Sequence, residues 1–309
     1  MLNRDERTEV RVPAECTPAL LVVVDTEEEF DWDADFDPGA TTVEAMRHIG
    51  RVQEIFQQAG VRPTYVIDYP VATQQTGFEL LRGYVDEGQA VLGAHLHPWV
   101  NPPQTEPVSR QNSFAGNLPR DLEAEKLAIL IEKLEASFGQ RPSIYKAGRY
   151  GLGQNTAEIL ENEGFKVDLS ACPAFDFSNE KGPDFTGFSC RPFWFGRQRD
   201  MLGIPTTNGF VGLARGLGSP LQSLVTRPLL ERLRTPGILS RLGLFTRLRL
   251  SPEGFDFREM RQLTEALLAD GVRTFTLSFH SPSVEPGYTP YVRDSIQLDR
   301  FLGILRDYL

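Results

Sequence analysis

Apolar, strand-like runs alternate with helix-like segments along almost the whole of this 309-residue chain. Each expected helix ends at a glycine, a residue that commonly closes a helix because it tolerates a left-handed backbone. A repeat of strand, helix, glycine and strand is typical of a parallel sheet with crossover helices. The expected strands cover residues 20–25, 64–68, 90–95, 143–147, 166–170, 202–206 and 274–280, and the expected helices cover residues 42–59, 118–138, 155–163 and 257–270.

The polar motifs of the chain lie at the carboxyl ends of these seven expected strands. That placement favours an incomplete or distorted (β/α) barrel over an open doubly wound sheet. In both architectures the carboxyl edge of the sheet carries the chemistry. The length fits one barrel domain, so we expect a single α/β domain over residues 1–309, with an extension at residues 1–17.

Composition excludes several classes of function. The formal net charge of −10 argues against nucleic acid and against anionic membrane surfaces as partners. Three cysteines without CxxC spacing (Cys16, Cys172 and Cys190) indicate reduced, buried side chains rather than a disulfide framework. The charged residues 1–7 contain no apolar signal core, and no run of about 18 apolar residues could cross a membrane. We therefore expect a cytoplasmic protein.

One segment interrupts the alternation. Residues 215–250 contain seven arginines and a single carboxylate, Glu231, and are rich in leucine. Their periodicity predicts one or two amphipathic helices, inserted at about residues 213–250 before the last strand. Two interpretations stay open: a solvated helical excursion packed on the barrel, or a basic flap that faces an anionic sugar, a lipid-linked substrate or a membrane surface.

Two of the four histidines, His95 and His97, end an apolar run. In a strand these positions point to the same face, so both imidazoles could bind one metal ion. The strand at residues 20–27 ends in Asp25 and Glu27 and can supply the carboxylate that such a site needs. Alternatively, the histidines are an ordinary hydrogen-bonded or exposed pair and the carboxylates cap the next helix. We interpret most of the acidic residues that follow, as far as Asp37, as solvated loop.

His280 ends the last expected strand, on the face that also carries Thr276 and Ser278. Its ordinary pKa lies near neutrality, which suits a general acid, although a merely hydrogen-bonded histidine is the alternative. Lys146 and Arg149 follow the fourth strand and could hold a carboxylate ionised or bind substrate. Asp168, near the end of the fifth strand, is either the partner of that cation or the residue that orients His280. His48 lies in a helix and is interpreted as a surface or packing residue.

Four segments together resemble the polysaccharide deacetylase superfamily (NodB homology, carbohydrate esterase family 4). They are residues 24–32 (VDTEEEFDW), 93–99 (GAHLHPW), 147–151 (AGRYG) and 277–283 (LSFHSPS), in the order of the family. The resemblance runs through nearly the whole chain and is closest to the WalW-like branch. It implies a distorted (β/α)7 barrel and metal-dependent removal of N- or O-acetyl groups from sugars.

The resemblance also implies roles for individual residues. Asp25 matches the catalytic base, and His280 matches the catalytic acid. Asp168 falls near the aspartate that tunes this acid. Lys146 or Arg149 matches the arginine that supports the base, because the local motif is one residue longer here and does not align uniquely.

The metal ligands implied by the resemblance are Glu27 and His95, with zinc as the first choice of ion. The family spaces its metal histidines at i and i+4, which here gives His95 and Trp99. The second ligand is therefore His97, or its position is empty. Glu27 stands where the family usually has aspartate, and the extra methylene could restore the reach of the carboxylate.

The resemblance predicts a metal-dependent hydrolase that deacetylates a sugar or polysaccharide precursor. Trp32, Trp99, Tyr150 and Trp194 could stack on sugar faces, and packing at the rim is the alternative role for these aromatic residues. Two alternatives stay open. One is an amidohydrolase that acts on a small amide or ureide, and the other is a carbohydrate-binding barrel without catalysis.

Overall fold

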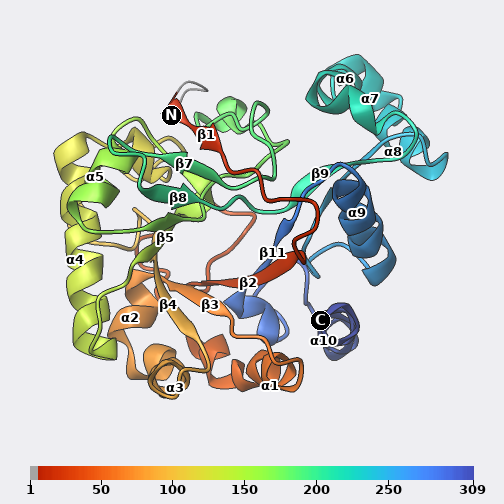
Figure 1. The fold of residues 1–309 in the computed structure, drawn as a ribbon. Helices are drawn as coiled ribbons and strands as arrows, with labels where there is room; N and C mark the ends of the chain where they lie inside the picture. Colours follow the sequence, from red (N-terminus) through yellow and green to blue (C-terminus); the bar gives the residue numbers. More distant parts are fainter. Residues whose placement is uncertain (1–5) are drawn as a thin grey trace.

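A curled, largely parallel sheet of nine strands organises the computed structural model, which describes residues 6–309 (Figure 1). The strand order is β1-β7-β8-β6-β5-β4-β3-β2-β11, and only β1 and β7 run antiparallel to their neighbours. The bounds are β1 (Thr8–Glu9), β2 (Ala19–Thr26), β3 (Thr64–Ile67), β4 (Val91–Leu96), β5 (Ile144–Ala147), β6 (Val167–Asp168), β7 (Phe193–Phe195), β8 (Met201–Gly203) and β11 (Thr274–His280). The expected α/β barrel is confirmed, with all seven expected strands. Residues 1–5, part of the expected extension and of the charged N-terminus, lie outside the described residues.

Helices cover the outer surface of the curled sheet (Figure 1). They are α1 (Gly50–Gln58), α2 (Tyr69–Thr73), α3 (Gln75–Asp86), α4 (Arg120–Phe138), α5 (Thr156–Asn162), α9 (Phe257–Ala269) and α10 (Ser295–Tyr308). The helix expected at residues 42–59 is in fact two elements, a 3-10 helix at Glu44–His48 followed by α1 from Gly50. Side-chain caps fix several helix starts: Asp68 accepts from Val71 N–H at α2, and Asp256 with Glu259 forms a capping box at α9.

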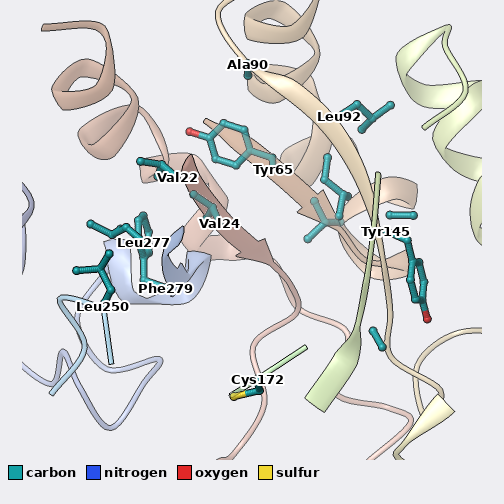
Figure 2. Packing of buried hydrophobic residues seen from close by; sticks show 14 of the residues in the cluster. Val22, Val24, Tyr65, Ala90, Leu92, Tyr145, Cys172, Leu250, Leu277 and Phe279 are labelled. Atoms are coloured by element: carbon teal, nitrogen blue, oxygen red, sulfur yellow. The ribbon is translucent and has the colours of Figure 1, made fainter. Parts of the chain in front are cut away.

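Alternate residues of each strand point to opposite faces, which places the catalytic candidates. On β2, Val22 and Val24 pack outward in the large core beneath the helices, and Val23 belongs to a smaller cluster inside the barrel. Val22 and Val24 pair with Leu277 and Phe279 of β11, and Figure 2 shows these four side chains together. Asp25 continues the inward set of Val23, and His280 continues the inward alternate positions of β11.

The barrel closes irregularly between the end of β8 and β11. Residues 206–207 cross this gap: Thr206 N–H donates to Ala171 O at 2.9 Å, and Thr207 N–H donates to Thr276 O at 3.4 Å. The Thr207 hydroxyl accepts from Thr276 N–H at 2.8 Å. These bonds replace a continuous ladder, so the barrel is distorted rather than regular.

The arginine- and leucine-rich segment forms a hairpin that carries three short helices. β9 (Asn208–Val211) and β10 (Thr246–Arg249) pair antiparallel, and α6 (Gly218–Val225), α7 (Pro228–Arg232) and α8 (Thr235–Arg241) extend away from the sheet between them (Figure 1). The expected helical insertion is present, but it consists of three short helices rather than one or two, because prolines and glycines interrupt it, and residues 246–249 are a strand. Within residues 6–309, every helix is too short or too polar to cross a bilayer.

Candidate active site

The carboxyl ends of β2, β4, β5 and β11 surround a cavity of about 400 Å³. Asp25, Glu27, His95, His97 and His280 all contribute to its lining. Residues that are up to 255 positions apart in sequence thus share one pocket, because parallel strands present their carboxyl ends at a single edge.

Glu27, His95 and His97 form a compact buried cluster. The Oε2 atom of Glu27 lies 3.6 Å from Nε2 of His95 and 3.5 Å from Nε2 of His97. One atom from each residue lies within 4.8 Å of the other two, close enough for a shared cation. The side chains are at most 3% exposed, so solvent does not separate them.

Hydrogen bonds hold both imidazoles with Nε2 toward Glu27. His95 Nδ1 lies 2.9 Å from the carbonyl oxygen of Lys146, which can only accept, so we assign the ring proton to Nδ1. His97 Nδ1 lies 2.8 Å from Oε2 of Glu28. Burial lowers the pKa of His97 to about 4, and burial together with the neighbouring His97 holds the pKa of His95 well below its usual value. Both rings are therefore neutral, with their Nε2 lone pairs free.

Glu27 has the environment of a carboxylate that needs a cation. Burial raises its pKa well above the usual value, and the neighbouring charges of Glu28 and Asp25 raise it further. Its Oε1 atom is buried, and it has no hydrogen-bond partner in the described chain. An orphaned buried oxygen beside two neutral imidazoles fits a divalent ion, which would satisfy all three groups.

Glu28 is a residue that the sequence analysis misplaced. We expected the acidic residues after Glu27 to be mostly solvated, yet Glu28 is fully buried and accepts from Trp99 Nε1 at 2.8 Å as well as contacting His97. Trp99 also stacks on His97, with ring centroids 4.2 Å apart. A carboxylate behind a ligand histidine fixes the ring orientation, so Glu28 and Trp99 together position His97. The even-numbered residues of β2, Val22 and Val24, point into the core beneath the helices. If the same alternation is extended past Glu27, it places Glu28 on this buried side.

Asp25 is paired with Lys146. Lys146 Nζ lies 2.5 Å and 2.6 Å from the two carboxylate oxygens, and both side chains are buried. Burial alone would raise the pKa of Asp25, but the charge of Lys146, with smaller contributions from His95 and His280, outweighs burial and lowers it. Arg149 also lines the pocket, but it is bonded to Glu180 and to the Ser113 hydroxyl. Lys146 is therefore the cation that the structure places beside Asp25.

His280 faces Asp25 across the pocket, with its Nε2 3.8 Å from Oδ2. Its Nδ1 lies 2.8 Å from Oε2 of Glu253, and its backbone N–H donates to Oε1 of the same residue at 3.1 Å. Ser283 also donates to Glu253 Oε1, at 2.5 Å. Glu253, which the sequence analysis missed, thus orients the ring. Only the short motif Ser251–Gly254 marked its position, and that motif does not reveal the contact.

Asp168 does not contact His280. It accepts instead from the Ser170 hydroxyl at 2.7 Å and from Ser170 N–H at 3.1 Å. Asp168 pairs in register with Tyr145, whose side chain packs outward against the helices, so strand parity turns Asp168 away from the pocket. Burial raises the pKa of Asp168 to about 6, and the two hydrogen bonds from Ser170, with a smaller contribution from the charge of Lys146, act in the opposite direction. Among the described residues Asp168 makes no hydrogen bond or ion pair with Lys146 or Arg149, which are bonded to Asp25 and to Glu180 instead, so the structure shows neither predicted contact of Asp168.

Three of the four expected sugar-stacking residues line the pocket. Trp32 packs edge-on against His280, with ring centroids 4.9 Å apart, and Tyr150 lies near the Lys146 ammonium. Trp99 is only 3% exposed and its indole N–H is occupied by Glu28, so most of its surface serves packing. Trp194 lies on β7 and is absent from the pocket lining. Stacking of Trp32 and Tyr150 on a sugar stays a prediction.

Fold and site define an α/β barrel whose carboxyl edge carries two buried acids (Asp25 and Glu27), two buried histidines (His95 and His97) and the partly exposed His280. No family model matches the chain, and no curated protein matches its sequence. The fold is similar to that of a candidate polysaccharide deacetylase from Mycobacterium smegmatis, with a TM-score of 0.53 and 16% identity over 97% of this chain and 89% of that one.

Two further solved structures have a similar fold. For Puue allantoinase the TM-score is 0.53 and the identity is 17%, over 94% of this chain and 82% of that one. For a candidate polysaccharide deacetylase from Pseudomonas aeruginosa they are 0.50 and 19%, over 92% and 83%. These similarities extend over nearly the whole chain and establish a shared fold.

Proposed function

We propose that this protein is a metal-dependent hydrolase of the polysaccharide deacetylase superfamily, in its WalW-like branch, that removes acetyl groups from a sugar or a polysaccharide precursor. The observation that carries the proposal is the convergence of two units on one pocket. The first is the ligand cluster of Glu27, His95 and His97, and the second is the facing pair of Asp25 and His280. A binding module has no need for the second unit.

Glu27, His95 and His97 would hold the ion, with zinc as the first candidate because the donors are two imidazoles and one carboxylate. When bound, such an ion supplies Lewis acidity, which polarises a carbonyl and lowers the pKa of a coordinated water from 15.7 to about 7. Glu28 keeps the Nδ1 atom of His97 occupied, so that Nε2 stays available as the donor.

Asp25 acts as the general base. Lys146 lowers its pKa and keeps it ionised at neutral pH, ready to take the proton of the attacking water. The same ammonium fixes the position of the carboxylate through two short hydrogen bonds. The pairing with Lys146 makes the Asp25 carboxylate a weaker base but keeps it ionised and correctly oriented.

His280 acts as the general acid that protonates the departing amine or alcohol. Amide cleavage especially needs this proton, because an unprotonated amine is a poor leaving group. Glu253 accepts from the Nδ1 side of the ring and directs Nε2 toward the cavity. His280 is partly exposed and lines the pocket, so it can reach a bound substrate.

A second function is favoured by one specific observation: the fold is as similar to an allantoinase as to the Mycobacterium smegmatis protein, with the same TM-score. On this reading the protein would hydrolyse a small cyclic amide or ureide with the same site residues. The sugar remains the first choice because Trp32 and Tyr150 line the pocket and offer aromatic faces.

The test is an activity screen with zinc present. N-acetylglucosamine oligomers and O-acetylated xylo-oligosaccharides are compared with allantoin and hydantoin, and release of acetate or ring opening is measured. We expect acetate release that stops when a chelator is added and that is lost in Asp25→Asn. Ring opening without acetate release would support the ureide reading, and absence of both reactions would contradict a hydrolase.

A further inference from the structure

Arg249 is a guanidinium in the wall of the catalytic pocket, and among the side chains that the structure describes it has no carboxylate partner. Its nearest hydrogen-bond acceptor is the Cys172 sulfur at 3.8 Å, and its guanidinium lies 5.5 Å from the Tyr150 ring and 4.8 Å from the Phe175 ring. Glu253, a carboxylate whose charge acts on Arg249, is already bonded to His280 and Ser283. A cation held on aromatic faces beside a cavity is available to a ligand.

The other charged residues of the pocket leave Arg249 in this state. Arg149 is occupied by Glu180, and Asp31 and Asp35 line the cavity without an ion pair to Arg249 in the described chain. Tyr150 and Tyr291 line the same cavity, and neither hydroxyl donates a hydrogen bond to another described residue. They are additional donors near the guanidinium.

We propose that Arg249 binds a negatively charged group of the substrate, a carboxylate or a phosphate on the acetylated sugar. This inference rests on the proposed function and deepens it. Guanidinium binds both groups through paired N–H donors, and in a partly buried site such charge-assisted bonds are stronger than neutral ones. β10 delivers Arg249, so the hairpin that interrupts the barrel supplies part of the substrate site.

Arg247 provides a matched control. It lies two residues earlier on the same face of β10, and its guanidinium lies 3.9 Å from the same Phe175 ring. It donates to Ala174 O and does not line the pocket. Removal of either charge alters the same strand and the same aromatic contact, but only Arg249 faces the cavity.

Binding of three probes is measured by calorimetry with and without chelator, so that an anion held by a metal is recognised. The probes are N-acetylglucosamine (neutral), N-acetylglucosamine 1-phosphate and N-acetylmuramic acid (a carboxylate). We expect the wild type to bind one charged probe at least about tenfold more tightly than the neutral sugar. Arg249→Gln should lose this preference, Arg249→Lys should keep part of it, and Arg247→Gln should keep all of it.

The preferred probe identifies the source of the charge. Equal affinity for all three probes in the wild type would overturn the inference, as would equal losses in the two glutamine variants. The proposed function fails separately: binding of a charged sugar with no acetate release would leave the anion site standing and contradict the deacetylase. Acetate release without a preference for a charged probe would support the deacetylase and contradict the anion site.

Residues 213–242, which contain α6–α8 and the turns beside them, carry a second inference, from a different observation. Large apolar side chains that are 43–88% exposed occur along this segment, together with exposed arginines. We define this leucine–arginine surface as Leu213, Leu217, Leu224, Leu229, Leu233, Ile238 and Leu242 with Arg227, Arg232, Arg234 and Arg241. An exposed apolar group of this size marks an interaction surface.

We propose that the leucine–arginine surface binds an anionic lipid surface. The whole chain has a net charge of −10, and from this the sequence analysis argued against anionic membranes. The charge is reversed locally, where arginines accompany the exposed leucines. Short helices with apolar and arginine-rich sides are typical of segments that lie in the headgroup region, and basic side chains there are attracted to anionic lipids.

Co-sedimentation tests this with vesicles of phosphatidylcholine alone or with about one third phosphatidylglycerol. We expect the protein to bind the anionic vesicles, less so in high salt. Leu229→Ser combined with Leu233→Ser should weaken binding at least about tenfold. Ile296→Ser, which removes a 78% exposed side chain on α10, should leave binding unchanged. No binding to anionic vesicles, or a dimer that the leucine variant dissociates, would overturn the proposal.

Discussion

Lys146 decides the charge state of Asp25, and this contact can be tested by one substitution. In Lys146→Met the carboxyl loses the cation that lowers its pKa, while the burial that raises the pKa stays. The pKa of Asp25 should therefore rise, and the acidic limb of the pH profile of kcat/KM should move to higher pH, since the base is active only when ionised. At neutral pH we expect a loss of about tenfold or more.

Lys166→Met, at an exposed lysine, is the matched control and should leave the profile unchanged. An acidic limb at the same pH in Lys146→Met and wild type would show that Asp25 is not the group that limits the rate in acid.

At this scale the sequence predicts some site residues and misses others for one physical reason. Asp25, His95 and His280 lie at the ends of apolar strands, so strand direction alone brings them to one edge. Glu28 and Glu253 act through contacts with His97 and His280, which are far from them in sequence. No local pattern encodes such a contact.

At the scale of elements, the turn after β5 lies directly against the end of β4. A Cβ added to Gly148 would lie 2.2 Å from Cδ2 and 3.0 Å from Nε2 of His97, and 2.6 Å from Leu96 O. We therefore expect Gly148→Ala to displace the His97 ring and to weaken metal binding at least about tenfold.

Gly83→Ala, in the middle of α3 with open space around the added carbon, is the control. It should leave metal binding unchanged and stabilise the fold by about 0.5–1 kcal/mol. Metal titration of both variants measures the effect. Equal affinity in Gly148→Ala and wild type would mean that His97 is not held by this contact.

The contact between α4 and the start of α5 depends on pH. Glu123 is buried, accepts from the Thr156 hydroxyl at 2.5 Å, and has a pKa raised by burial from 4.5 to about 7. The folded state therefore binds this proton more tightly than the unfolded chain does, so stability falls as pH rises from about 4.5 to 7, by up to about 3 kcal/mol.

Glu123→Gln removes this titration. Relative to wild type, the variant should gain unfolding free energy between pH 5 and 7.5 in denaturant titrations. The exposed Glu125→Gln on the same helix should follow the wild type. A constant difference between Glu123→Gln and wild type over this range would contradict the assignment.

Element types follow from periodicity where a strand or helix is long, and this accounts for β2, β4, β11, α4 and α9. The hairpin of β9 and β10 escaped prediction because Arg247 and Arg249 alternate with Leu248 in only four residues. So short a pattern is also compatible with the end of a helix. The prolines and glycines that separate α6, α7 and α8 can be seen in the local sequence. The pairing of β9 with β10 joins residues that are far apart in the sequence, so no local pattern predicts it.

At the scale of the whole molecule, the site exists only when the barrel is closed. Asp25 and His280 come from neighbouring strands at opposite ends of the chain, and residues 206–207 bridge the remaining gap through hydrogen bonds. An ion held by Glu27, His95 and His97, as proposed, would connect β4 to the end of β2. Binding to the folded state alone would therefore stabilise the entire barrel.

Metal content is the most direct measure of the central claim, that Glu27, His95 and His97 hold one ion. Elemental analysis after equilibration with zinc and removal of free metal should find about one ion per wild-type chain. His97→Ala should lose the ion and the stabilisation that it gives, and His48→Ala, at a partly exposed histidine beside Glu285, should keep both. A wild type without stoichiometric metal, or a His97→Ala variant that retains it, would contradict the account.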